Sequence, residues 1–150
     1  MEHVNLAEGI EVYSMPAKSF PDCVLEAHQA LHGIVPFDGK RNYFGLSRPE
    51  HGTIVYKAAA EVLPSDPAFS ELARQTIPEG EYLGIRVEDF RNDIKAIGEA
   101  FQELIHRPGI DPEGYCVEWY QNNDTVVCMV KLAASPAPST LDTQKKATLS

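Results

Sequence analysis

Hydrophobic residues recur along the chain with a period of two in several short segments and near 3.6 in two longer ones. The first short segment, 9–15, is β-prone and predicts a strand. The apolar residues from Phe20 to Leu31 have helical spacing, which predicts a helix capped by Ser19 and stopped by Gly33. Two further alternating segments, 43–47 and 53–63, predict a hairpin, so the first half has the order strand, helix, strand, strand.

The same order of elements recurs in the second half. After a loop at 64–76, with a short helical stretch at 69–74, the segment 79–87 predicts a strand. Asp89 is a candidate cap for a strongly periodic helix over 90–105. Two more strands follow, at 114–120 and 125–132, joined by an amide-rich turn.

Neither half has enough elements to close a hydrophobic core alone. We therefore expect one α+β domain over 1–133, built from two strand-helix-strand-strand modules at about 8–63 and 78–133. The modules would form an antiparallel or mixed sheet with two main helices and a central ligand cleft. The segment 134–150 has little to bury and is expected to be a flexible tail.

Composition narrows the function classes. The 150 residues include 13 Lys and Arg against 22 Asp and Glu, a formal charge of −9, which disfavours direct nucleic-acid or anionic-membrane binding and mildly favours a cationic partner. The acidic start lacks the features of a signal peptide, no apolar run is long enough for a membrane span, and the three cysteines form no C-x-x-C pair. These features predict a cytoplasmic protein; the oligomeric state stays open.

The candidate chemistry centres on Glu118, a carboxylate within the apolar and aromatic strand 114–120. A turn centred on Asn122 and Asn123 would place Glu118 opposite Val127, with a set of neighbours on the acid's face and another set on the helix-packing face. On this register the first set is Cys116, Tyr120 and Met129, and the second is Val117, Trp119 and Cys128. An acid among aromatic rings suits a flat, lipophilic cation. The alternative is an edge Glu in water, or one paired with Lys131 or Arg86.

Three stretches carry a resemblance to a known family: Gly45-Leu46-Ser47-Arg48-Pro49, Thr76-Ile77-Pro78-Glu79-Gly80-Glu81-Tyr82 and Gly114-Tyr115-Cys116-Val117-Glu118-Trp119-Tyr120. In order and spacing they resemble the GyrI-like (gyrase-inhibitor-like) small-molecule-binding family, which also forms the effector-binding domain of AraC-type and MerR-type bacterial transcription activators. The resemblance covers about 8–133 and implies two strand-helix-strand-strand modules with a binding cleft between them. The chain shows no helix-turn-helix, so DNA binding is not implied.

The resemblance also implies which residues bind the ligand. The family's acidic anchor falls on Glu118 and its strand-opening aromatic residue on Tyr82. Trp119 and Tyr120 occupy the following aromatic positions, while Phe44 and Tyr56 are further wall candidates whose alternative is plain core packing.

Other chemistries have less support. His28 and His32 lie four residues apart on the first helix, a spacing that can hold zinc, but no third ligand is evident and partly exposed helix histidines are the simpler interpretation. On the expected register Cys116 and Cys128 lie on opposite faces, which argues against a disulfide. No phosphate-binding loop is present. We expect neither metal nor cofactor.

Three function classes follow. The first is a stand-alone, multidrug-type protein that binds or sequesters lipophilic, cationic aromatic compounds without turnover. The second is a small-molecule hydrolase in which Glu118 is the general base on strained electrophiles. The third is a gyrase-inhibitor-like protein-interaction module that uses its acidic surface.

Overall fold

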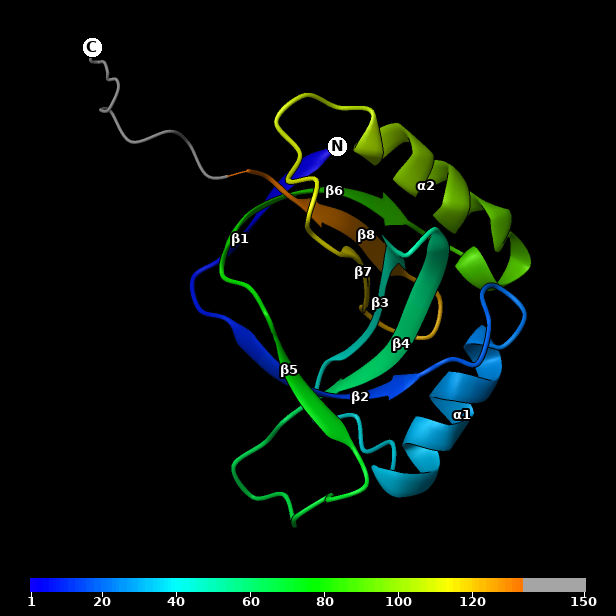
Figure 1. Ribbon diagram of the computed structural model, residues 1–150, viewed down its shortest axis with the longest axis vertical. Coiled ribbons are helices and arrows are strands. Elements are labelled where there is room, and N and C mark those ends of the chain that lie inside the picture. Colours follow the sequence, from blue (N-terminus) through cyan, green and yellow to red (C-terminus); the bar gives the residue numbers. More distant parts are fainter. Residues whose placement is uncertain (134–150) are drawn as a thin grey trace.

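The protein is an α+β fold in which one curled antiparallel sheet carries two helices on its outer face (Figure 1). The computed structural model describes residues 1–133; the tail expected at 134–150 lies outside them. The strands are β1 (Glu2–Leu6), β2 (Ile10–Pro16), β3 (Tyr43–Glu50), β4 (Thr53–Glu61), β5 (Ala73–Ile77), β6 (Gly80–Val87), β7 (Cys116–Tyr120) and β8 (Val126–Lys131). The helices are α1 (Val24–Ile34), a 3₁₀ turn η1 (Phe90–Asn92) and α2 (Lys95–Ile105).

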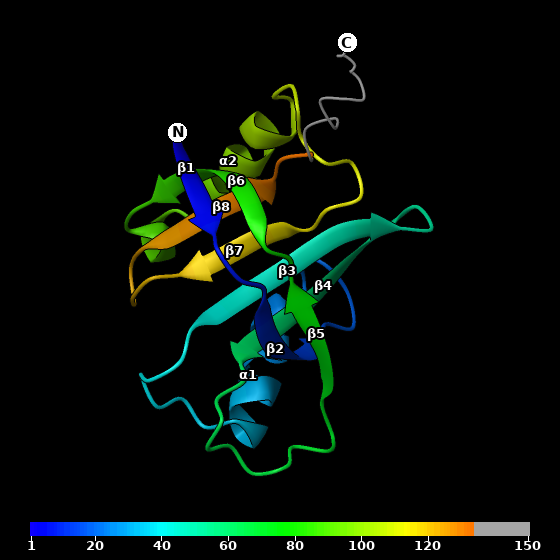
Figure 2. The same ribbon diagram turned by 90° about the vertical axis from the view of Figure 1, so that its left-hand side faces the viewer.

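The eight strands follow the order β1-β6-β8-β7-β3-β4-β2-β5, and every pair is antiparallel. Of the two sheet types that the sequence left open, antiparallel and mixed, the structure has the antiparallel one. Strands β1 and β2 follow one another along the chain and pair with β6 and β5, which are also consecutive. This arrangement curls the sheet on itself, as the side view in Figure 2 shows.

Each face of the sheet builds its own core, because alternate residues of a strand point to opposite faces. The inner face packs side chains from both halves against each other. On the outer face α1 covers β4 and β2, while α2 covers β8 and β6. The inner core contains Leu6, Val12, Phe44, Leu46, Ile77, Tyr82, Val117 and Met129.

The strands β1 and β5 were not expected from the sequence. The segment 64–76 was expected to be a loop with a helical stretch over 69–74, yet its end forms β5. Both are edge strands of the sheet, and most of their side chains are exposed or half-buried. Neither therefore contains a run of apolar residues. They are held by pairing with distant strands, β1 with β6 and β5 with β2, rather than by local strand propensity.

The helix boundaries also differ from the expectation. Helix α1 begins at Val24, after Cys23, and no side chain caps it; the Ser19 hydroxyl donates instead to Cys23 Sγ. It passes through Gly33 to Ile34. Asp89, with φ of 58°, precedes the 3₁₀ turn, and α2 starts later, at Lys95. Asp93, with φ of −151° and ψ of 71°, leaves the helical conformation, so the helical pattern at 90–105 divides into the 3₁₀ turn and α2.

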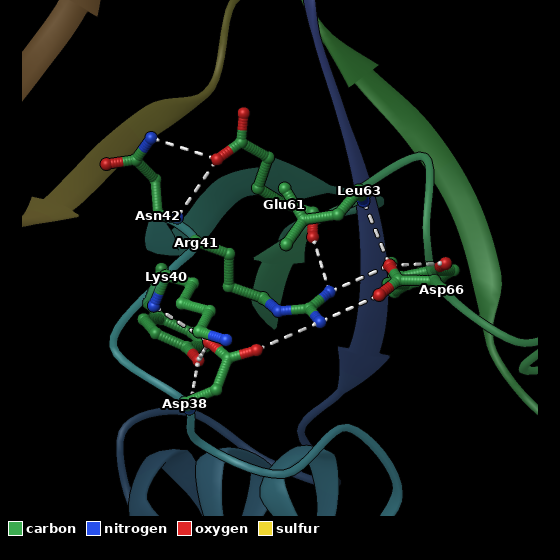
Figure 3. A network of polar contacts seen from close by, with 9 residues as sticks. Asp38, Lys40, Arg41, Asn42, Glu61, Leu63 and Asp66 are labelled. Carbon is green, nitrogen blue, oxygen red and sulfur yellow. Dashed lines mark hydrogen bonds and ion pairs between the residues drawn. The ribbon is translucent and has the colours of Figure 1, made fainter.

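A buried ion pair fixes the loops at the α1 end of the sheet. Arg41 donates from both terminal nitrogens to Asp66, each at 2.8 Å, and also to the Glu61 carbonyl at 2.9 Å (Figure 3). Asp66 also accepts from the Leu63 amide and the Tyr13 hydroxyl. The Arg41 guanidinium holds the pKa of Asp66 far below its usual range. This network ties the segment before β3 to the loop after β4.

None of the helices within residues 1–133 combines the length and the apolar composition that a membrane crossing requires.

Candidate functional site

A cleft of about 870 Å³ lies on the outer face of the sheet, between the start of α1 and the length of α2. Its floor is formed by β7, with contributions from β3 and β8, and its mouth by the segment 107–115. Most of the lining is apolar, and it includes the half-exposed side chains of Phe20, Ile54, Ile94 and Ile105. A concave, largely apolar site with a few polar groups is the usual form of a small-molecule site.

Glu118 is the acidic group of the cleft floor. Its side chain is buried, with 8% of the residue exposed, and its Oε1 accepts hydrogen bonds from Tyr120 Oη at 2.5 Å and Tyr56 Oη at 3.1 Å. Within residues 1–133 the other oxygen, Oε2, has no hydrogen-bond partner. Unlike His32 Nδ1 and Arg41 Nε, which are fully buried without a partner, Oε2 is not sealed off inside the protein. One oxygen is therefore held by the protein and the other is left for an occupant of the cleft.

His28 extends this network to helix α1. Its Nε2 lies 2.8 Å from Tyr56 Oη, and its ring contacts the rings of Tyr56 and Tyr120 edge-on. The sequence interpretation of His28 as a partly exposed helix residue missed this role. A signal was present: His28 lies four residues after Val24 and three before Leu31, on the apolar stripe of the helix.

Burial sets the electrostatics of the network. It raises the pKa of Glu118, and the hydroxyl donors Tyr120 and Tyr56 oppose that rise without cancelling it. Burial, with a smaller contribution from His32, lowers the pKa of His28 to about 4. The pKa values of the Tyr56 and Tyr120 phenols are well above their usual value, again chiefly through burial. Near pH 7 the two tyrosines and the histidine are neutral.

The expected register of the last hairpin is wrong by one residue. Glu118 lies opposite Cys128, not Val127, because the loop 121–125 is one residue longer than the expected turn. Asn122 Oδ1 accepts from the amides of Asp124 and Thr125 and so stabilises this longer loop. Glu118 therefore shares its face with Cys128 rather than Met129, and this is also the face on which α2 packs.

The corrected register also changes the face of the sheet on which the cysteines lie. Cys116 and Cys128 lie on one face, so the expectation that they point apart is wrong; both are nevertheless free thiols. Burial first, and the charge of Glu118 second, raise the pKa of Cys116 to about 11 and of Cys128 to about 12. Neither thiol supplies a ready thiolate near neutral pH.

The residues predicted for the site fall on two faces of the sheet. Glu118, Tyr120 and Tyr56 come together on the outer face, in direct hydrogen-bond contact. Phe44 and Tyr82 lie in the inner core, and Trp119 packs against that core with its indole nitrogen donating to Asn42. Strand alternation separates Trp119 from its neighbours Glu118 and Tyr120. Tyr82 lines a different, smaller cavity of about 330 Å³.

Two of the charged side chains that line the cleft form ion pairs. Arg48 forms an ion pair with Glu50 and stacks over the Tyr115 ring, and Arg107 pairs with Glu103. Lys95 and Asp111 also line the cleft. Of the two carboxyl groups that line the cleft, Asp111 and Glu118, the one on the floor is Glu118.

Comparison with known proteins shows likeness in fold. No family model and no curated protein sequence matches the chain. A crystal structure of an integron cassette protein from the mobile metagenome of Vibrio cholerae is similar with a TM-score of 0.66 at 14% identity, covering 87% of this chain and 94% of the other. A hydrolase from Listeria innocua is similar with a TM-score of 0.50 at 11% identity, covering 88% of this chain and 90% of the other.

Proposed function

We propose that the protein binds lipophilic, cationic aromatic compounds in the cleft above Glu118. The observation that carries the proposal is a buried carboxylate with one oxygen held by two tyrosines and the other unpartnered within residues 1–133, at the floor of an apolar cleft. Binding or sequestration, rather than turnover, is the primary role that we assign. The earlier resemblance to the GyrI-like family supports the same assignment.

The energetics favour a cation over a neutral ligand of equal shape. A carboxylate removed from water is costly unless it is paired, and the apolar lining weakens the screening that water would supply. A cation beside Oε2 offsets that cost. The aromatic groups around the cleft, among them Phe20, Phe101 and Tyr120, add contact area and cation–π attraction.

Glu118→Gln tests the proposal, because it keeps the shape of the side chain and removes its charge. Fluorescence titration would compare ethidium, a flat permanent cation, with phenanthridinone, a neutral analogue of its ring system. We expect wild type to prefer ethidium and Glu118→Gln to weaken ethidium at least tenfold while changing phenanthridinone less than twofold. Equal weakening of both probes, or no binding of ethidium by wild type, contradicts the proposal.

Hydrolysis of a strained electrophile is the second candidate. It is favoured by the placement of Glu118, with its raised pKa, beside the Tyr120 and Tyr56 hydroxyls, a set that can activate water and stabilise a developing oxyanion. One of the similar structures is also named a hydrolase. Incubation with an aromatic epoxide, followed by chromatography, separates the two: a diol formed by wild type and lost in Glu118→Gln supports turnover, whereas stoichiometric binding without product supports the first candidate.

We also propose that the fold arose from two copies of a strand-helix-strand-strand module. The support is the strand order: after β1, β2, β3 and β4 are exchanged with β5, β6, β7 and β8, it reads the same from the opposite end of the sheet. In each half one further strand, β1 or β5, precedes the module. Each half also contributes one long helix to the outer face. On this interpretation the cleft lies where the two modules meet.

A further inference from the structure

The Tyr56 hydroxyl lies between two groups that can both accept its proton. Tyr56 Oη is 2.8 Å from His28 Nε2 and 3.1 Å from Glu118 Oε1. A phenol has one proton to donate, so it cannot donate to both neighbours at once. The direction of this chain of two hydrogen bonds is therefore a property of all three residues together.

The charge of Glu118 decides that direction. When Glu118 is a carboxylate, Oε1 is the stronger acceptor, Tyr56 donates to it, and His28 must present an Nε2–H to the Tyr56 oxygen. When Glu118 is protonated on Oε1, it donates to Tyr56, Tyr56 donates to His28 Nε2, and the His28 proton sits on Nδ1. In each state both hydrogen bonds that link His28, Tyr56 and Glu118 are formed. The two states differ in the tautomer of His28.

We propose that Tyr56 and His28 are a proton exit for Glu118, through which the cleft releases a proton when it takes up a cation. At a pH below the folded-state pKa of Glu118, the empty cleft holds the proton on Glu118 Oε1. As a cation reaches Oε2, the O–H bond of Glu118 breaks and its proton passes to Tyr56 Oη, while the Tyr56 proton passes to His28 Nε2. The Nδ1–H bond of His28 then breaks and that proton goes to water. No electrons are exchanged, and one proton is released for each cation bound.

The position of His28 suits the end of such a path. The residue is half-buried. Within residues 1–133 the side-chain atoms that are fully buried without a hydrogen-bond partner do not include its Nδ1. Because burial lowers the pKa of His28 to about 4, the ring stays neutral above pH 5 and passes a proton on rather than keeping it. The raised pKa of Glu118 favours the protonated empty state.

Other titratable groups surround Glu118. Strands β4, β7 and β8 contribute phenols and thiols whose pKa values all lie well above neutral, so they do not change charge in the range of the test. The charged groups that line the cleft lie on β3, on α2 and in the segment 107–115. The neutral set is Tyr56, Cys116, Tyr120 and Cys128; the charged set is Arg48, Lys95, Arg107 and Asp111.

The coupling itself can be tested without a ligand. Long-range ¹H–¹⁵N NMR spectra distinguish the two imidazole tautomers, and spectra of the full chain would be recorded from pH 5 to pH 9. We expect His28 to change from Nδ1–H to Nε2–H as Glu118 ionises. A His28 tautomer that stays the same from pH 5 to pH 9 overturns the proposal.

Calorimetry with ethidium tests the release of the proton and rests on the proposed function. Titration at one pH in phosphate and in Tris, which differ in ionisation enthalpy, gives the number of protons released. We expect up to one proton per ethidium from wild type, declining as pH rises. Ethidium binding that depends on Glu118 but releases no proton at any pH from 5 to 9 overturns the proton exit alone. Absence of ethidium binding contradicts the proposed function, while the ligand-free spectra still decide the coupling.

Tyr56→Phe removes the proton carrier and leaves the ring. We expect the variant to fold, as judged by its amide spectrum, and its His28 tautomer to become independent of pH between 5 and 9. A tautomer change that persists in Tyr56→Phe overturns the proposed path through this hydroxyl. If the variant does not fold, the wild-type spectra remain the deciding measurement.

Discussion

Gly45 on β3 lies directly opposite Glu118 on β7, and a methyl group at residue 45 would come within 2.8 Å of Glu118 Oε1. The same methyl group would overlap the hydroxyl of Tyr56. The missing side chain of Gly45 is therefore the space in which Tyr56 reaches across β3 to bind Glu118. This close approach explains a glycine in the middle of a buried strand, where it otherwise costs stability.

Gly45→Ala should break the Tyr56–Glu118 hydrogen bond and destabilise the fold by about 1–3 kcal/mol, the usual cost of overpacking a core. Urea denaturation measures the change. Gly33→Ala is the matched control, because a Cβ at that position in helix α1 meets nothing within 4 Å and should stabilise the helix by about 0.5–1 kcal/mol. A Gly45→Ala variant as stable as wild type would mean that Tyr56 and Glu118 do not occupy this space.

The raised pKa of Glu118 predicts a pH-dependent cost to stability. Below pH 4.5, the ordinary value, Glu118 is protonated in both the folded and the unfolded chain and the cost is absent. As pH rises from 4.5 through the folded-state pKa, the unfolded chain gains by ionising first, so the folded state loses stability.

Glu118→Gln removes this titration and leaves the other groups unchanged. Relative to wild type, the variant should therefore gain stability as pH rises from 4.5 to 8, as measured by urea denaturation at each pH. A stability difference between the two proteins that is constant over this range would contradict the raised pKa.

The Arg41–Asp66 pair should contribute far more to stability than the ion pairs on the surface. Both side chains are 6% exposed, and removal of one partner leaves a buried charge, which typically costs about 3–5 kcal/mol. Arg41→Ala should show such a loss in urea denaturation. Arg74→Ala is the control: Arg74 pairs with Glu11 at 2.6 Å, but both are more than half exposed, and the loss should stay below about 1 kcal/mol. Equal losses for the two variants would contradict this interpretation.

The order of the main elements could be predicted because it depends on local patterns. Both long helices, both hairpins and the α+β class follow from the period of the apolar residues. The two edge strands, β1 and β5, could not be predicted in this way. Each is held by pairing with a strand far away along the chain, as Leu6 pairs with Gly80 and Ser14 with Ala73, and no local pattern reports such pairing.

The acid of the site could also be predicted, since a carboxylate in an apolar strand is conspicuous. Its neighbours could not be assigned correctly, because a loop longer by one residue at 121–125 exchanges the faces of every side chain on β8. Asn122 decides that length through its side-chain hydrogen bonds, which spacing alone does not reveal. His28 and Tyr56 meet only after α1 folds onto β4.

Removal of one hydroxyl group on each face of the sheet distinguishes the cleft from the inner core. Tyr120 Oη donates to Glu118, and loss of a hydrogen bond to a charged group typically costs about 1.5–3 kcal/mol. Tyr120→Phe should also raise the pKa of Glu118 further, because this donor favours the carboxylate. A higher pKa leaves less of Glu118 ionised, so we expect ethidium affinity to fall about tenfold or more at pH 7.

Tyr82→Phe makes the same chemical change on the inner face, where the Tyr82 hydroxyl donates to the Pro78 carbonyl at 2.7 Å. It should cost about 1 kcal/mol of stability and leave ethidium affinity within twofold of wild type. Fluorescence titration of the two variants under the same conditions makes the comparison. A larger loss of affinity in Tyr82→Phe than in Tyr120→Phe would place the bound cation on the inner face, in the smaller cavity beside Tyr82, and not above Glu118.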